Sequence, residues 1–146
     1  MIEIEKNIVA HNSDSDKLKT VPYDEILTLR FLNILIAEDN YINQLVLKKM
    51  LEGVGHTVEI VVNGQEACDI LIIKNFDLII MDVHMPIMDG LEATEHIRRS
   101  DSKIPILGCT ADTFSDEVSN FKTIGMNDVV VKPIHLQNLL VRINGV

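Results

Sequence analysis

Side chains that can take part in chemistry follow short apolar runs at four places in this chain. They are Glu38 and Asp39, then Asp82, then Thr110 with Asp112, and last Lys132. Short, continuous apolar runs are typical of strands that are covered on both faces of a parallel sheet. Because such sheets bind ligands beyond the carboxyl ends of their strands, we expect these side chains to lie close together.

The carboxylates of Glu38, Asp39 and Asp82 predict a bound cation. Two negative charges about 4 Å apart repel each other by roughly 4 kcal/mol at an effective dielectric constant of about 20. Lys132 offsets part of that repulsion. Oxygen ligands that do not enclose the ion suit Mg²⁺, which keeps several waters and accepts phosphate oxygens. We therefore expect a magnesium site with room for a phosphate-bearing substrate.

Such a site has the parts that phosphoryl transfer requires: a nucleophile, a cation and donors for the phosphoryl oxygens. Asp82 can be the nucleophile, and its carboxylate is already ionised at neutral pH. Thr110 and Lys132 can contact the phosphoryl oxygens. Each feature alone has a structural alternative, since Glu38-Asp39-Asn40 could simply cap a helix. The prediction depends on the agreement of four strand ends.

The elements that position these residues alternate between strands and helices. Apolar runs predict strands at 34–37, 58–62, 77–81, 104–109 and 129–131. Helical patterns are expected at 40–53, 64–73, 90–99, 115–124 and 136–143. This alternation is typical of an α/β fold with an open, doubly wound parallel sheet, because a closed eight-unit barrel needs about 250 residues.

Composition bounds the function further. The 146 residues fit one domain, and the formal net charge of −9 argues against binding to nucleic acid or to an anionic membrane surface. The two cysteines form no disulfide framework or zinc motif, no signal peptide is evident, and no apolar run is long enough to span a bilayer. We expect a cytoplasmic receiver of phosphate at 33–146, preceded by an arm or linker at 1–32 with one or two helical turns at 23–32.

The segments around these residues resemble the receiver domains of two-component response regulators and hybrid histidine kinases. The resemblance covers about 33–146. The segments that carry it are Ile34-Leu35-Ile36-Ala37-Glu38-Asp39-Asn40, Met81-Asp82-Val83-His84-Met85-Pro86-Ile87-Met88-Asp89-Gly90, Gly108-Cys109-Thr110-Ala111 and Val131-Lys132-Pro133-Ile134. The resemblance implies a flavodoxin-like sheet of five strands in the order 2-1-3-4-5.

The resemblance also implies roles for individual residues. Asp82 would accept phosphate from a histidine kinase or a histidine phosphotransfer protein, making the chain a signalling phosphoacceptor and not an enzyme acting on other molecules. Asp39 would bind Mg²⁺ directly, with Glu38 beside it and the backbone carbonyl of His84 completing the metal shell. The peptide bond before Pro133 would be cis.

Two departures and two tuning positions qualify this resemblance. Val129 stands where the family often has Tyr or Phe, so the usual aromatic switch cannot operate. Glu38 replaces the more frequent Asp, as in many hybrid-kinase receivers. By resemblance, His84 and Asp112 tune the lifetime of the phosphorylated state. We hypothesise that Asp112 positions the attacking water.

The helix after Asn40 carries more apolar residues than one buried stripe requires. We expect part of this surface to bind a four-helix phosphotransfer domain through Ile42, Leu45, Val46 and Leu47, although all of them could instead be core. A pure interaction module without phosphorylation is the alternative function. An aspartyl-nucleophile phosphatase is set aside, because that family resembles Asp-x-Asp-x-Thr, whereas this chain has Asp82-Val83-His84.

Overall fold

The computed structural model describes residues 30–111 and 115–146, and its compact unit runs from Phe31 to Val146. The expected helical turns at 23–32 lie mostly outside the described residues, and 30–32 are not helical. The boundary expected between 32 and 33 stays a prediction. Within the described part of the chain, no helix combines the length and apolar character needed to cross a membrane.

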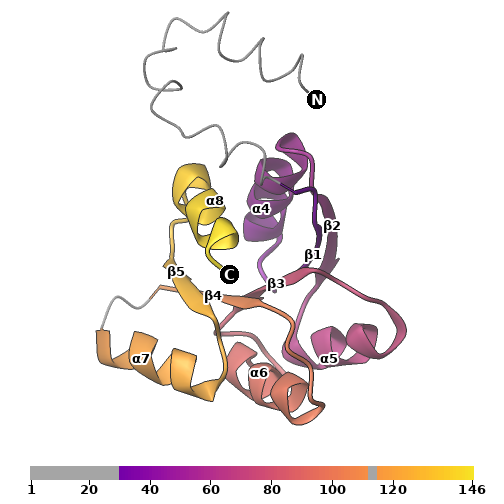
Figure 1. Ribbon diagram of the computed structural model, residues 1–146, viewed down its shortest axis with the longest axis vertical. Helices are drawn as coiled ribbons and strands as arrows, with labels where there is room; N and C mark the ends of the chain where they lie inside the picture. Colours follow the sequence, from indigo (N-terminus) through magenta and orange to yellow (C-terminus); the bar gives the residue numbers. More distant parts are fainter. Residues whose placement is uncertain (1–29, 112–114) are drawn as a thin grey trace, which may run out of the picture. The chain divides into compact units, whose positions relative to one another are not determined.

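The chain forms one parallel sheet of five strands in the order β2-β1-β3-β4-β5, which confirms the predicted fold (Figure 1). The strands are β1 (Asn33–Ala37), β2 (Thr57–Val61), β3 (Leu78–Asp82), β4 (Ile106–Thr110) and β5 (Asp128–Val131). Each lies within two residues of its predicted start and end, and the largest difference is at β4, which begins at Ile106 instead of 104.

Helices cover both faces of the sheet (Figure 1). They are α4 (Tyr41–Gly53), α5 (Gly64–Ile73), α6 (Gly90–Arg99), α7 (Ser115–Ile124) and α8 (Leu136–Asn144). One core cluster joins the sheet to α4 and α8, and a second joins it to α5, α6 and α7. Successive residues of a strand point to opposite faces, so Ile80 enters the first cluster and Ile79 and Met81 the second.

Three helices begin at polar caps near the carboxyl ends of the strands. The side-chain oxygens of Asn40, Asn63 and Asp89 each accept a hydrogen bond from the backbone N–H three residues later, at 2.8–3.0 Å. Such caps satisfy donors that the first turn of a helix leaves without partners, and each contributes about 1 kcal/mol. They also set where α4, α5 and α6 start, and therefore how the loops leave β1, β2 and β3.

Two glycines hold the loop between β3 and α6 close to the sheet. The Gly90 N–H donates to the Val83 carbonyl at 2.9 Å, and the Gly64 N–H donates to the Met88 carbonyl at 2.9 Å. A Cβ at Gly90 would collide with the backbone carbonyl oxygen of Asp82, and one at Gly64 would lie 2.7 Å from the Met88 oxygen. The sheet end that carries Asp82 therefore requires residues without side chains beside it.

We predict that Gly90→Ala lowers the free energy of unfolding by about 2 kcal/mol, because the backbone of β3 must shift to admit the methyl group. Urea denaturation followed by circular dichroism measures this. Gly53→Ala is the matched control: a Cβ there meets no atom within 4 Å. That change should leave stability equal or raise it by up to about 1 kcal/mol. Equal losses in the two variants would contradict the close approach at Gly90.

Candidate functional site

The carboxyl edge of the sheet brings the predicted polar residues together. Glu38 and Asp39 follow β1 directly, Asp82 is the last residue of β3, and Thr110 is the last residue of β4. Lys132 follows β5. β2 lies at the sheet edge, in agreement with the absence of comparable residues after it.

The carboxylates of Glu38, Asp39 and Asp82 form one cluster. Each offers an oxygen, and these three oxygens lie within 4.8 Å of one another. Glu38 and Asp82 are buried, whereas Asp39 is exposed. The open side of the cluster therefore lies at Asp39, where a hydrated ion could enter.

Lys132 connects two of these carboxylates. Its Nζ lies 2.9 Å from Glu38 Oε1 and 3.1 Å from Asp82 Oδ1. Burial lowers the pKa of Lys132, but the hydrogen bonds to Glu38 and Asp82 and the charges of those carboxylates raise it by more, so the net shift is upward. The ammonium group is therefore held in its charged form between the ends of β1 and β3.

Glu38 is fixed by contacts at every polar atom. Its N–H donates to the Val61 carbonyl at 3.0 Å, and its carbonyl accepts from Gln44 Nε2 at 2.7 Å. Its Oε2 accepts from the Asn40 N–H at 3.2 Å, while Oε1 binds Lys132. The part played by Gln44 was not predicted from the sequence, although its place one turn after Asn40 is a signal that could have found it.

The charge balance of the cluster favours a divalent cation. The carboxylates of Glu38, Asp39 and Asp82 contribute −3 and the Lys132 ammonium +1, which leaves −2. Uncompensated charge of this kind is costly where two of the carboxylates are withdrawn from water. All three ligand groups offer oxygen, and one side is open to solvent, as Mg²⁺ prefers. The residues present fit that ion.

Thr110 and Cys109 complete the end of β4. Thr110 is fully buried, and its carbonyl accepts from the Lys132 N–H at 2.8 Å. Burial raises the pKa of Cys109 to about 12, with the carboxylates of Asp82 and Glu38 adding to the effect and Lys132 opposing it. That thiol stays protonated near neutral pH and acts as a small apolar residue.

The remaining sequence predictions differ in outcome. The peptide bond between Lys132 and Pro133 is cis, as the resemblance implied. His84 is exposed in the turn after β3, and its tuning and metal-binding roles stay predictions. Asp112 lies outside the described residues, so its role also stays a prediction. Val129 is buried in the core beside Gly108 and Met126.

The expected partner surface on α4 is partly wrong. Leu47 is only 3% exposed and packs in the core with α8, so it cannot contact a partner. Ile42 is 63% exposed and Val46 43%, while Leu45 is half-buried. Ile42 and Val46 are one turn apart on the solvent side of the helix. Their role in docking stays a prediction.

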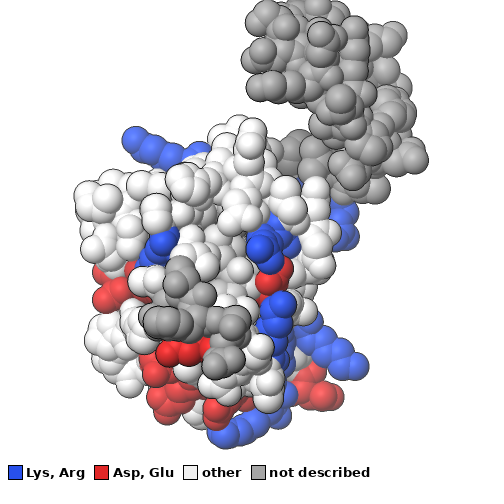
Figure 2. All heavy atoms as spheres, turned by 90° about the vertical axis from the view of Figure 1, so that its left-hand side faces the viewer, with Lys and Arg blue, Asp and Glu red and all other residues white. Residues whose placement is uncertain are grey.

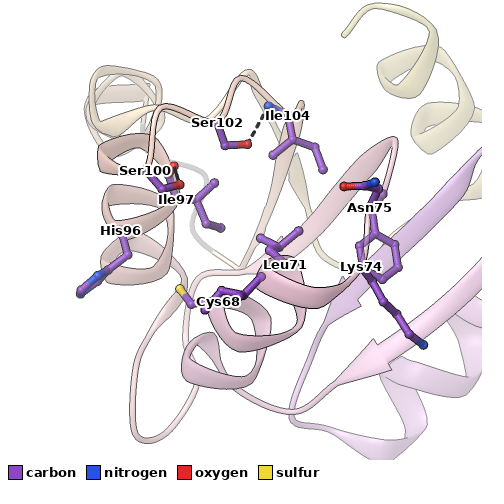
Figure 3. Close-up of a pocket in the computed structure, with 11 residues that line it drawn as sticks. Cys68, Leu71, Lys74, Asn75, His96, Ile97, Ser100, Ser102 and Ile104 are labelled. Carbon is purple, nitrogen blue, oxygen red and sulfur yellow. Dashed lines mark hydrogen bonds between the residues drawn. The ribbon is translucent and has the colours of Figure 1, made fainter.

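A separate cleft of about 440 Å³ lies between α5 and α6, and Figure 3 shows part of its lining. Leu71 and Ile97 come from these helices, and Asn75, Phe76 and Ile104 precede β3 and β4. Because those residues precede the strands, the cleft lies at the amino-terminal edge of the sheet, opposite the carboxylates. Burial raises the pKa of the Cys68 thiol in its wall, and the charges of Asp69 and Glu92 add to this. The cleft is no part of the carboxylate site.

Charged side chains of both signs lie on the surface of the described residues. Figure 2 shows that acidic and basic side chains are interspersed over the described residues of the face that includes α7. No continuous basic patch is visible on that face.

Comparisons with known proteins agree with this geometry. The family described as response regulator receiver domain matches residues 34–144. The chain is 33% identical to sensor protein EvgS of Escherichia coli over 138 residues, which is 94% of this chain and 11% of EvgS. It is 36% identical to two-component response regulator 24 of Arabidopsis thaliana over 110 residues, which is 75% of this chain and 79% of that protein. The chain thus spans about a tenth of the length of EvgS.

Solved structures show the same likeness. The receiver domain of sensor histidine kinase PA1611 from Pseudomonas aeruginosa, with magnesium in its active-site cleft, is 32% identical with a TM-score of 0.73 over 80% of this chain and 97% of that one. A chain in the co-crystal of the Saccharomyces cerevisiae phosphotransfer protein Ypd1 with the Ssk1 receiver is 30% identical, with a TM-score of 0.74 over 78% and 87%. This chain therefore belongs to the response regulator receiver domain family.

Proposed function

We propose that Asp82 accepts a phosphoryl group from a phosphohistidine protein in a Mg²⁺-dependent phosphorelay. The observation that carries this proposal is the Asp82 carboxylate itself: it is 5% exposed, is paired with Lys132 at 3.1 Å, and lies within the acidic cluster. A purely structural aspartate would not need two further carboxylates beside it, which repel it.

In the proposed reaction an Asp82 oxygen forms a bond to phosphorus as the bond from phosphorus to the histidine nitrogen breaks. The electron pair of the broken bond stays on that nitrogen. Glu38, Asp39 and Asp82 would hold Mg²⁺, which when bound neutralises charge on the phosphoryl oxygens. Lys132, already 3.1 Å from Asp82, would bind one of these oxygens, and the hydroxyl of Thr110 would bind another.

The partner class follows from the relatives. A related receiver, that of Ssk1, is seen together with the phosphotransfer protein Ypd1, so we propose a histidine kinase or a histidine phosphotransfer protein as the donor for this chain. We expect the domain to work in the cytoplasm as a signalling phosphoacceptor. Exposed Ile42 and Val46 on α4 would contribute to docking.

The first prediction of this proposal concerns phosphorylation without a partner. Acetyl phosphate with Mg²⁺ should add one phosphoryl group, seen by intact mass spectrometry, and EDTA should abolish the gain. Asp82→Asn should show no gain, because an amide is not a nucleophile of this kind. Absence of labelling in the wild type, with a phosphohistidine protein also tried, would favour the pure interaction module.

The second prediction concerns the metal alone. Asp39→Asn should weaken Mg²⁺ binding at least about tenfold in isothermal titration calorimetry, because it removes the exposed charged ligand (about 1.4 kcal/mol per factor of ten). Asp69→Asn is the matched control, since it removes the same charge from an exposed position on α5. Equal weakening in both variants would mean that only the net charge of the chain matters.

The third prediction concerns the ion pairs of Lys132. Because the pKa of Lys132 is higher in the folded state than in the unfolded state, its charged form stabilises the fold. This stabilisation is fully present at pH values below the unfolded pKa of 10.5 and is lost as the pH rises through the folded pKa. The difference in unfolding free energy between wild type and Lys132→Met should therefore shrink above pH 10.5. Lys74→Met, which breaks an exposed pair with Glu59 at 2.9 Å, is the control. A pH-independent difference for Lys132→Met would contradict the pairing.

A further inference from the structure

The loop between β3 and α6 holds an isoleucine in an unfavourable position. Ile87 follows Asp82 by five residues, is 82% exposed, and has a φ of 71°. The Met88 N–H donates to the Pro86 carbonyl at 2.8 Å, which closes a three-residue γ-turn with Ile87 at its centre. A γ-turn with positive φ at its centre is rare and strained.

The residue type makes this turn more costly. A β-branched residue at positive φ is a clear outlier, and such backbone strain lowers the stability of the fold. Among the residues that the structure describes, Asp101 is the other non-glycine with positive φ, and Asp is a type that tolerates it. The exposed side chain of Ile87 gains little burial in return. Folding of this domain alone gives no reason for isoleucine here.

The position of Ile87 suggests what covers it. Other exposed apolar residues follow the next two strands toward the β2 side of the sheet, at the same edge: Tyr41 and Ile42 in the first turn of α4 after β1, and Val62 after β2. We call Ile87, Tyr41, Ile42 and Val62 the apolar rim. It borders the β2-β1-β3 half of the edge, whereas Thr110 and Lys132 occupy the β4-β5 half. A protein that brings a phosphohistidine to Asp82 must cover this edge.

We propose that Ile87 is an anchor for the protein donor, binding the apolar side of a histidine phosphotransfer helix during transfer to Asp82. This inference rests on the proposed function and adds a specificity-determining residue to it. Such a role would account for a side chain that is both strained and exposed. A small-molecule donor needs no such contact.

The test separates strain from contact with two variants. Ile87→Gly removes both the strain and the side chain, and its melting temperature should rise by about 2–6 °C. Ile87→Thr keeps the β-branch and its strain but replaces the apolar end, so its melting temperature should stay within about 1 °C of wild type. Ile72→Thr is the matched control, since Ile72 is equally exposed, at 82%, on α5 near the opposite edge of the sheet.

Transfer is measured from phosphorylated Ypd1 and, separately, from phosphoramidate. In both Ile87 variants the rate of transfer from Ypd1 should fall about tenfold, while the rate from phosphoramidate should stay at the wild-type value. The control variant Ile72→Thr should keep the wild-type rate with both donors. Unchanged rates from Ypd1 in the Ile87 variants would overturn the anchor, as would a wild-type rate from Ypd1 no faster than from phosphoramidate at equal concentration. A melting temperature of Ile87→Gly at or below wild type would overturn the strained turn. Failure of both Ypd1 and phosphoramidate to label wild-type Asp82 would instead overturn the proposed function, and the anchor with it.

Discussion

Two carboxylates lie buried side by side at the end of this sheet, and the residues around them must compensate their negative charge. Glu38 is 1% exposed and Asp82 5%. Lys132 compensates both, and it does so from β5, across the end of the intervening β4. Only a long, flexible side chain with a charged tip can span that distance while its stem stays partly buried. The strand order and the ion pairs thus depend on each other.

The surroundings of the site are rigid on one side and open on the other. Gly64 and Gly90 let α5 and α6 approach so closely that the backbone after β3 is held by hydrogen bonds at both ends of its loop. Asp39, by contrast, is exposed at the edge of the cluster. Fixed oxygen ligands with one open side suit an ion that must keep waters and exchange them for phosphate oxygens. The magnesium ion in the active-site cleft of the related PA1611 receiver agrees with this arrangement.

The fold and most of the site were predictable because they depend on pattern. Each short apolar run forms a strand, and the polar residue after the run lies at the carboxyl end of that strand. A parallel sheet brings those ends together at one edge. The face of a helix is harder to predict: Leu47 and Leu51 lie one turn apart in the core, while Ile42 and Val46 lie one turn apart in solvent. The apolar residues of α4 form two stripes, and composition alone does not say which one faces the sheet. The positive φ of Ile87 was also beyond prediction, because isoleucine is among the residues least expected there.

In the proposed reaction Asp82, and no other carboxylate of the cluster, carries the phosphoryl group. Reduction of the phosphorylated protein with borohydride converts an acyl phosphate to an alcohol, and peptide sequencing by mass spectrometry then locates the modified residue. We expect homoserine at position 82 and unmodified Glu38 and Asp39. Modification at Glu38 or Asp39, or labelling at a histidine with Asp82 unchanged, would contradict it.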